Sequence, residues 1–174
     1  KELEKGIKIN PNSVEGNKQL GAWHLRMGNY EKANHYLQKA DDLDPFSLLN
    51  IGYIGGYYHE IGDFEKTIVY ANRLIAMEPN FYFGHFLLGL VIYQNELNEA
   101  LAESNLAVKL IGEQNIGALF SLGVVYGRMN EKEKAYSILK KMDAIGISKD
   151  ETFYEYANVF AGLGEWDKAF EYYE

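Results

Sequence analysis

Apolar residues recur along this chain at helical spacing, in pairs of segments that are separated by short polar turns. Leu119, Leu122 and Tyr126, for example, share one face of a helix. In the same way, a turn at Gly28-Asn29 comes before a second helix that runs from Tyr30 to about Leu43. Related turns are Gly62-Asp63, Met129-Asn130 and Gly164-Glu165. The pattern predicts an all-α chain without strands, with first helices near 14–27, 48–61, 82–94, 116–128 and 150–162.

The helix pairs follow a period of 34 residues, which three series of residues share. The first is formed by the prolines, which end the second helices because the residue before a proline avoids the helical region. The second and third are formed by small residues, which let two helix backbones approach closely. The series are Pro11, Pro45 and Pro79; then Gly21, Gly55, Gly89, Gly123 and, in the next place, Ala157; then Ala33, Thr67, Leu101, Ala135 and Ala169. One common period indicates a repeat protein.

The period divides the chain into repeats at 14–47, 48–81, 82–115 and 116–149. Residues 1–13 have the pattern of the end of a preceding repeat, and 150–174 that of a truncated one, so we expect one array that is a fragment of a longer protein. The third repeat is irregular. Its small residue is Ala100, one position early, and the turn Asn95-Glu96-Leu97 is one residue short. We expect a local change of helix packing there.

These residues resemble the tetratricopeptide repeat (TPR) family, whose pattern is a large apolar residue, then Leu-Gly, Tyr, Ala and Pro. The fourth repeat matches it with Leu119, Leu122-Gly123, Tyr126 and Ala135. The first repeat departs from it, with Asn17 and His24 at the large positions. The resemblance implies a TPR-type α-solenoid, a right-handed superhelix of antiparallel helix pairs. It also implies a function in binding another protein.

The last repeat, from Glu155 to Glu171, and the segment Asp44-Pro45-Phe46-Ser47 resemble the repeat tails of some bacterial regulators. In that group the repeats follow a winged-helix DNA-binding domain or a nucleotide cyclase domain. The resemblance implies a place in bacterial signalling, with the output domain outside these residues.

Composition and charge narrow the classes of partner. The chain has no cysteine, which excludes disulfides and thiolate chemistry and is consistent with a cytoplasmic location. No apolar run reaches the roughly 20 residues that a membrane span needs. The formal charge of −8 repels nucleic acid, and the lysines near residues 132–141 are interleaved with Glu131, Glu133 and Asp143. We therefore expect neither a membrane nor a nucleic acid as partner.

The candidate chemical groups favour packing over catalysis. His24, His35, His59 and His85 include no zinc-binding pair, and the cluster Asp41, Asp42 and Asp44 lacks the calcium-loop pattern. Gly52, Gly55 and Gly56 lie inside a helix and are not followed by the Lys-Ser/Thr of a phosphate loop. We expect no enzyme activity, no catalytic residue, no metal and no cofactor.

A second apolar stripe indicates a binding surface. Phe83, Phe86, Leu90 and Tyr93 lie on one face of the third first helix, apart from the stripe of His85 and Gly89 that packs within the solenoid. In the TPR fold such a stripe lines the concave groove, where Phe83, Phe86, Tyr93, Phe120 and Tyr154 should be partly exposed. The alternative is that side chains of adjacent repeats bury it. The predicted groove consists of Leu49, His59, Glu60, Phe83, Phe86, Leu90, Tyr93, Phe120, Val124, Arg128 and Tyr154.

The groove lacks the clamp with which some TPR proteins hold a carboxyl terminus. Lys18 matches its first residue, but Ala22, Tyr53, Phe83 and Leu87 occupy the others. An aromatic groove favours an apolar peptide or helix. Two alternatives remain: a structural segment that forms a homodimer or larger homo-oligomer, and a sensory segment of a transcription regulator or cyclase.

Overall fold

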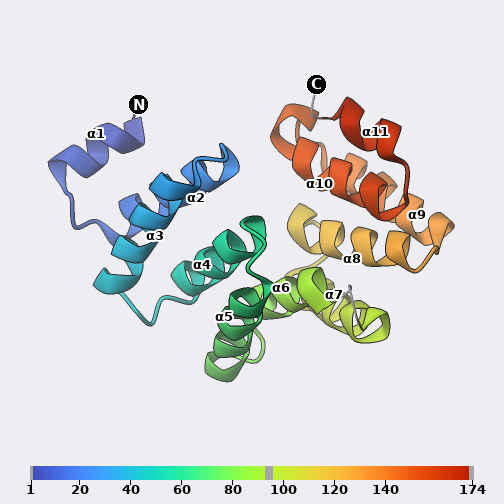
Figure 1. Ribbon diagram of the computed structural model, residues 1–174, viewed down its shortest axis with the longest axis horizontal. Coiled ribbons are helices and arrows are strands. Elements are labelled where there is room, and N and C mark those ends of the chain that lie inside the picture. The colour runs from blue at the N-terminus through green and yellow to red at the C-terminus, as the bar shows by residue number, and fades with distance from the viewer. Residues whose placement is uncertain (1, 93–95, 173–174) are drawn as a thin grey trace. The chain divides into compact units, whose positions relative to one another are not determined.

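The computed structural model describes residues 2–92 and 96–172, and all of its regular elements are helices (Figure 1). The chain forms two compact units, Lys1–Pro79 and Asn80–Glu174. Unit 1 contains α1 (Glu2–Ile9), α2 (Val14–Arg26), α3 (Tyr30–Leu43), α4 (Leu48–Glu60) and α5 (Phe64–Met77). Unit 2 contains α6 (Tyr82–Ile92), α7 (Leu97–Ile111), α8 (Ile116–Arg128), α9 (Lys132–Ile145), α10 (Lys149–Gly162) and α11 (Trp166–Glu171).

Each helix that was predicted as the first of a pair packs on the helix that follows it. The pairs are α2 with α3, α4 with α5, α6 with α7, α8 with α9 and α10 with α11. All five first helices begin within one residue of the predicted positions. No residue in the described ranges forms a strand, so the prediction of an all-α fold is confirmed.

The turns inside the pairs have a common geometry. In the first pair Gly28 has a φ of 68°, and the Asn29 N–H donates to the His24 carbonyl at 2.9 Å, which closes the end of α2. Asn130 takes the equivalent place in the fourth pair with a φ of 60°. Asn is among the few non-glycine residues that adopt this conformation readily. The fourth turn therefore corresponds to Asn130-Glu131, one residue later than the predicted Met129-Asn130, and the Glu131 N–H donates to the Tyr126 carbonyl at 2.9 Å.

Small residues lie where helices touch, as the 34-residue pattern predicted. A Cβ atom on Gly21 would be 2.6 Å from Leu37 Cγ of α3. One on Gly89 would be 2.2 Å from Ser104 Oγ of α7 and 2.8 Å from Ser121 Oγ of α8. Ser104 and Ser121 are fully buried and hydrogen-bonded to each other at 2.7 Å. Gly89 therefore leaves the space that this hydroxyl pair fills.

The polar residues that break the repeat pattern in the first pair are buried and have specific contacts. Asn17 is fully buried, and its Nδ2 donates to the carbonyls of Pro11 at 3.0 Å and Ser13 at 2.8 Å. The amide thereby gives the Pro11 carbonyl a donor that an apolar residue would lack, and it adds a second donor to the Ser13 carbonyl, which also accepts the Asn17 backbone N–H at 3.0 Å. His24 is 5% exposed and stacks on Tyr36 with ring centroids 5.6 Å apart.

The second helix of the third pair is longer than its counterparts. Helix α7 has 15 residues, whereas α3, α5 and α9 have 14 each, and α6 is described as far as Ile92. Ala100 is fully buried, so the small residue that is one position early still lies at a helix contact. Helix α7 ends at Ile111, and the next residue, Gly112, has a φ of 93° that suits glycine. Asn95, which belongs to the predicted short turn, is outside the described residues.

Candidate functional site

Four aromatic side chains from the first helices of unit 2 form a continuous row. The Phe83 and Phe86 rings of α6 are 5.6 Å apart between centroids. The Phe86 ring is 6.2 Å from that of Phe120 on α8, which is 5.8 Å from that of Tyr154 on α10. Helix α8 packs against both α6 and α10. We call Phe83, Phe86, Phe120 and Tyr154 the aromatic row.

The period of the repeat places these rings in line. Phe86, Phe120 and Tyr154 are 34 residues apart and so occupy the same position on three successive first helices. Their centroid separations and tilted or edge-on geometries are those in which aromatic rings attract each other. The row is therefore a product of the repeat, and each helix holds its ring against the next.

The members of the row differ in exposure. Phe83, Phe86 and Tyr154 are half-buried, and so they present part of their surface. Phe120 is 4% exposed, so the prediction that it would be partly exposed is wrong. Its ring lies between those of Phe86 and Tyr154, which cover its two sides.

Two other residues of the predicted groove belong to the core. Leu90 and Val124 are 4% and 5% exposed and are part of one buried cluster with Phe120, Leu119 and Val159. For these two positions burial by neighbouring repeats, the alternative drawn from the sequence, is what the structure shows. Arg128 is exposed at the last residue of α8.

The remaining predicted residues are not part of the row. Leu49 is 40% exposed, and His59 and Glu60 are half-buried, all on α4 of unit 1. His59 Nδ1 is 3.7 Å from Glu60 Oε1. Tyr93 lies outside the described residues. The structure thus brings together Phe83, Phe86, Phe120 and Tyr154.

Sequence reasoning missed two aromatic neighbours of the row. Tyr82 stacks on Phe83 with ring centroids 5.6 Å apart and an interplanar angle of 9°. Phe81, just before α6, is 5.6 Å from Tyr82 and 6.4 Å from Phe83. A single helical stripe selects one residue per turn and passes over adjacent positions. The aromatic run Phe81-Tyr82-Phe83 in the sequence was the available signal.

The histidines that were assigned to packing lie between helices. His85 is 6% exposed, and its Nδ1 is 2.6 Å from Glu103 Oε2, which links α6 to α7. Burial lowers the pKa of His24, and the nearby positive charge of Lys32 lowers it further. Within the described residues no group of three or more His, Cys, Asp or Glu side chains could hold a metal ion.

The acidic cluster Asp41, Asp42 and Asp44 lies at the end of α3. Burial raises the pKa of the Asp41 carboxyl, Arg73 opposes this, and Asp42 and Asp44 add to it. Arg73 itself donates to the Pro45 carbonyl at 2.7 Å. Asp41 and Asp44 are half-buried, and Asp42 is exposed.

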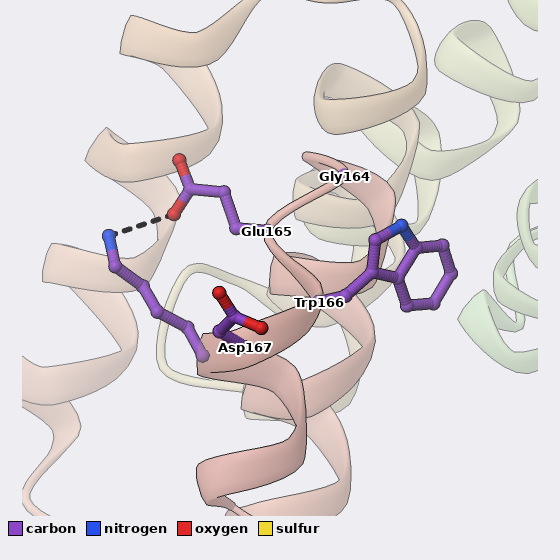
Figure 2. A pocket seen from close by; sticks show the side chains of 5 residues that line it. Gly164, Glu165, Trp166 and Asp167 are labelled. Atoms are coloured by element: carbon purple, nitrogen blue, oxygen red, sulfur yellow. Dashed lines mark hydrogen bonds and ion pairs between the residues drawn. The ribbon is translucent and has the colours of Figure 1, made fainter.

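A shallow hollow at the last turn of unit 2 is lined by Gly164, Glu165, Trp166, Asp167 and Lys168 (Figure 2). Lys168 Nζ pairs with Glu165 Oε2 at 2.8 Å, and both contact the Tyr136 hydroxyl of α9. The hydrogen bond from Lys168, followed by that from Tyr136, lowers the pKa of Glu165. The Trp166 indole points away from this pair and is 52% exposed. These hydrogen bonds link α9 to the start of α11. The hollow itself is lined by five consecutive residues.

In the described part of the chain, no helix combines the length and the hydropathy that are needed to cross a membrane.

Comparisons with known proteins agree with the helical repeat. Residues 19–47 match the family model described as tetratricopeptide repeat. Anaphase-promoting complex subunit 3 of Schizosaccharomyces pombe (strain 972) is 24% identical over 134 residues, which are 76% of this chain and 20% of that protein. The chain therefore spans about a fifth of the length of that relative.

Solved structures show the same fold. A thermophilic TPR protein of Thermus thermophilus has a TM-score of 0.73 at 19% identity, with 92% of this chain and 88% of that chain covered. The type IV pilus biogenesis factor PilW has a TM-score of 0.66 at 16% identity, covering 98% and 79%. YrrB, a TPR protein with an unusual peptide-binding site, has 0.57 at 18% identity, covering 99% and 89%.

The chain is thus a helical-repeat protein whose fold is that of the TPR α-solenoids. Residues 19–47 match the tetratricopeptide repeat model, and the likeness to the solved TPR structures concerns the fold.

Proposed function

We propose that this chain is a protein-interaction module that binds a peptide or helix of another protein on the aromatic row of unit 2. The observation that carries this proposal is that the four rings of the aromatic row contact each other along three successive first helices. Three of the four rings, those of Phe83, Phe86 and Tyr154, are half-buried. Aromatic side chains supply large contact area and are favoured as binding hot spots. The TPR fold is typical of modules that bind proteins.

The other residues of the predicted groove have supporting parts in this proposal. Leu90 and Val124 support the row as core residues of the same cluster as Phe120, and Arg128 is exposed at the last residue of α8. Leu49, His59 and Glu60 stay a prediction for unit 1. Catalysis has no part in the proposal, because Phe83, Phe86 and Phe120 have no ionisable side chain and the Tyr154 hydroxyl alone could titrate.

A defined test starts from peptides selected from a displayed random library against the full chain. The double change Phe83→Ala and Phe86→Ala should weaken their binding at least about tenfold, since truncation of a hot spot often costs over about 2 kcal/mol. Phe170→Ala is the matched control, because Phe170 is a 62% exposed aromatic residue on α11 outside the row.

Thermal melts monitored by circular dichroism show whether the double variant stays folded. If it does not, Tyr154→Ala replaces it, because Tyr154 is a half-buried end member of the row. Equal affinity of the selected peptides for wild type and both row variants would contradict the proposal.

Three finer statements stay predictions: a homodimer, a cytoplasmic location, and a place in a bacterial regulator. Sizing at several protein concentrations tests the first. If the row pairs with a second copy, the double variant should be monomeric at concentrations where wild type is dimeric.

A further inference from the structure

One helical turn before Phe86, Phe120 and Tyr154 there is a second line of equivalent positions, whose residues differ in chemistry. This line begins with Phe83, which also belongs to the aromatic row. It continues at intervals of 34 residues with Gly117 on α8 and Glu151 on α10. Gly117 and Glu151 each come three residues before a ring of the row, Phe120 or Tyr154, and so lie one helical turn before it on the same face. An aromatic ring and a carboxylate thus occupy the two ends of a line whose middle member has no side chain.

The middle of this line has no side chain of its own. Where a Cβ atom of Gly117 would lie, Asn115 Oδ1, which accepts from the Ala118 N–H, is at 3.3 Å, and no other described atom outside Gly117, its chain neighbours and the nearby backbone of α8 lies within 4 Å. A side chain from a partner can approach the α8 backbone there beside the Asn115 amide. Larger residues at the equivalent positions of α6 and α10 would flank it.

The charges around the row favour a basic group at this place. Helix α6 contains no Asp, Glu, Lys or Arg, and Arg128 at the end of α8 is the single such residue of that helix. Glu151 is exposed on α10. Residues 80–174 contain eight Lys or Arg and fourteen Asp or Glu, a formal charge of −6. An acidic ligand would be repelled by this unit, whereas a cationic one is attracted to it.

We propose that the aromatic row, if it binds as proposed above, takes a cationic amphipathic segment of a protein. Its apolar side chains cover Phe86 and Tyr154, and a Lys or Arg lies across Gly117 between the Phe83 ring and the Glu151 carboxylate. A cation over an aromatic face and a charge-assisted contact to a carboxylate are both favourable. This occupant is a polypeptide, because the rings of the row require an apolar stripe next to the basic group.

The test uses the full chain and two synthetic peptides labelled with fluorescein. Each has about 16 residues and the same apolar stripe at helical spacing, and one carries Lys where its twin carries Glu. Fluorescence anisotropy should give a dissociation constant at least about tenfold lower for the Lys peptide. The difference should shrink between about 50 mM and about 500 mM salt, because salt screens exposed charges.

Two charge-reversal variants locate the effect. Glu151→Lys should weaken binding of the Lys peptide at least about fivefold, a change of roughly 1 kcal/mol. Glu133→Lys makes the same change of net charge at an exposed position of α9 and should have a much smaller effect. A thermal melt of each variant confirms that it is folded.

The outcomes separate the two proposals. Equal or tighter binding of the Glu peptide, or equal weakening by Glu151→Lys and Glu133→Lys, would overturn the basic occupant. The binding surface would still stand if Phe83→Ala with Phe86→Ala weakens whichever peptide binds. Binding of the Lys peptide that this double variant leaves unchanged would overturn both. Absence of binding by either peptide would overturn the basic occupant, and the library selection would then decide on the surface.

Discussion

Polar side chains at buried positions show at the scale of single residues how this repeat departs from its pattern. Asn17 and His24 stand where large apolar residues are expected, and both are buried. Asn17 donates to loop carbonyls, whereas His24 is packed between aromatic rings, with Tyr36 stacked on it and Trp23 edge-on at 4.8 Å. His24 Nδ1 is buried with no hydrogen-bond partner among the described residues. The histidine is therefore held in an environment that favours its neutral form.

This environment predicts a pH dependence of stability. Because burial lowers the pKa of His24 in the folded chain, the unfolded state takes up a proton first as the pH falls through about 6.5. The free energy of unfolding should therefore decrease below that pH, by about 1.4 kcal/mol for each unit by which the pKa is lowered. Urea unfolding at about pH 8 and about pH 5 measures the change.

His24→Gln is the reference for this measurement, because the amide does not titrate and all other ionisable groups are kept. The wild type should lose more stability than the variant between the two pH values. An equal loss in both proteins would show that His24 does not contribute to the pH dependence.

At the scale of elements, close approach of helices depends on single small residues. Gly89 leaves room at the junction of α6, α7 and α8 for the hydrogen bond between Ser104 and Ser121. The 34-residue series predicted that this glycine lies at a helix contact, and the structure confirms it. Which side chains it faces was not predictable, because both serines come from other helices.

Gly89→Leu should therefore destabilise the chain by about 1–3 kcal/mol, the usual cost of an overpacked core. Gly56→Leu is the matched control: Gly56 is also helical, and no atom outside the local chain lies within 4 Å of its Cβ position. It should be neutral or slightly stabilising, since leucine has the higher helix propensity. Urea unfolding of both variants measures the difference, and equal stabilities would contradict the assigned contact.

At the scale of the whole molecule, the chain consists of two compact units. In repeat proteins each repeat contacts its neighbours, so stability is distributed along the chain and can be lost locally. A defect at Gly89 should therefore weaken unit 2 more than unit 1.

Hydrogen exchange followed by mass spectrometry tests this for Gly89→Leu. Amides of α6–α9 should exchange faster than in the wild type, whereas those of α2–α4 should change little. Equal acceleration in all helices would show that the chain unfolds as one cooperative unit.

The amino-acid sequence by itself determined the helices, their pairing and most of the turns. These features depend on local rules, because apolar spacing, prolines and glycines act within a few residues, and the 34-residue period repeats them. It also led to the prediction that Phe83, Phe86, Phe120 and Tyr154 share one face, although the contact between their rings was not predicted.

The tertiary structure alone decided how deeply each of these side chains is buried. Phe120 is enclosed because the neighbouring helices carry rings at the same position, and Leu90 and Val124 join the core of unit 2. Exposure depends on the size and distance of side chains that come from residues far away in the chain. The period fixes which positions face each other, and the packing of the particular side chains there fixes how much surface is left for a partner.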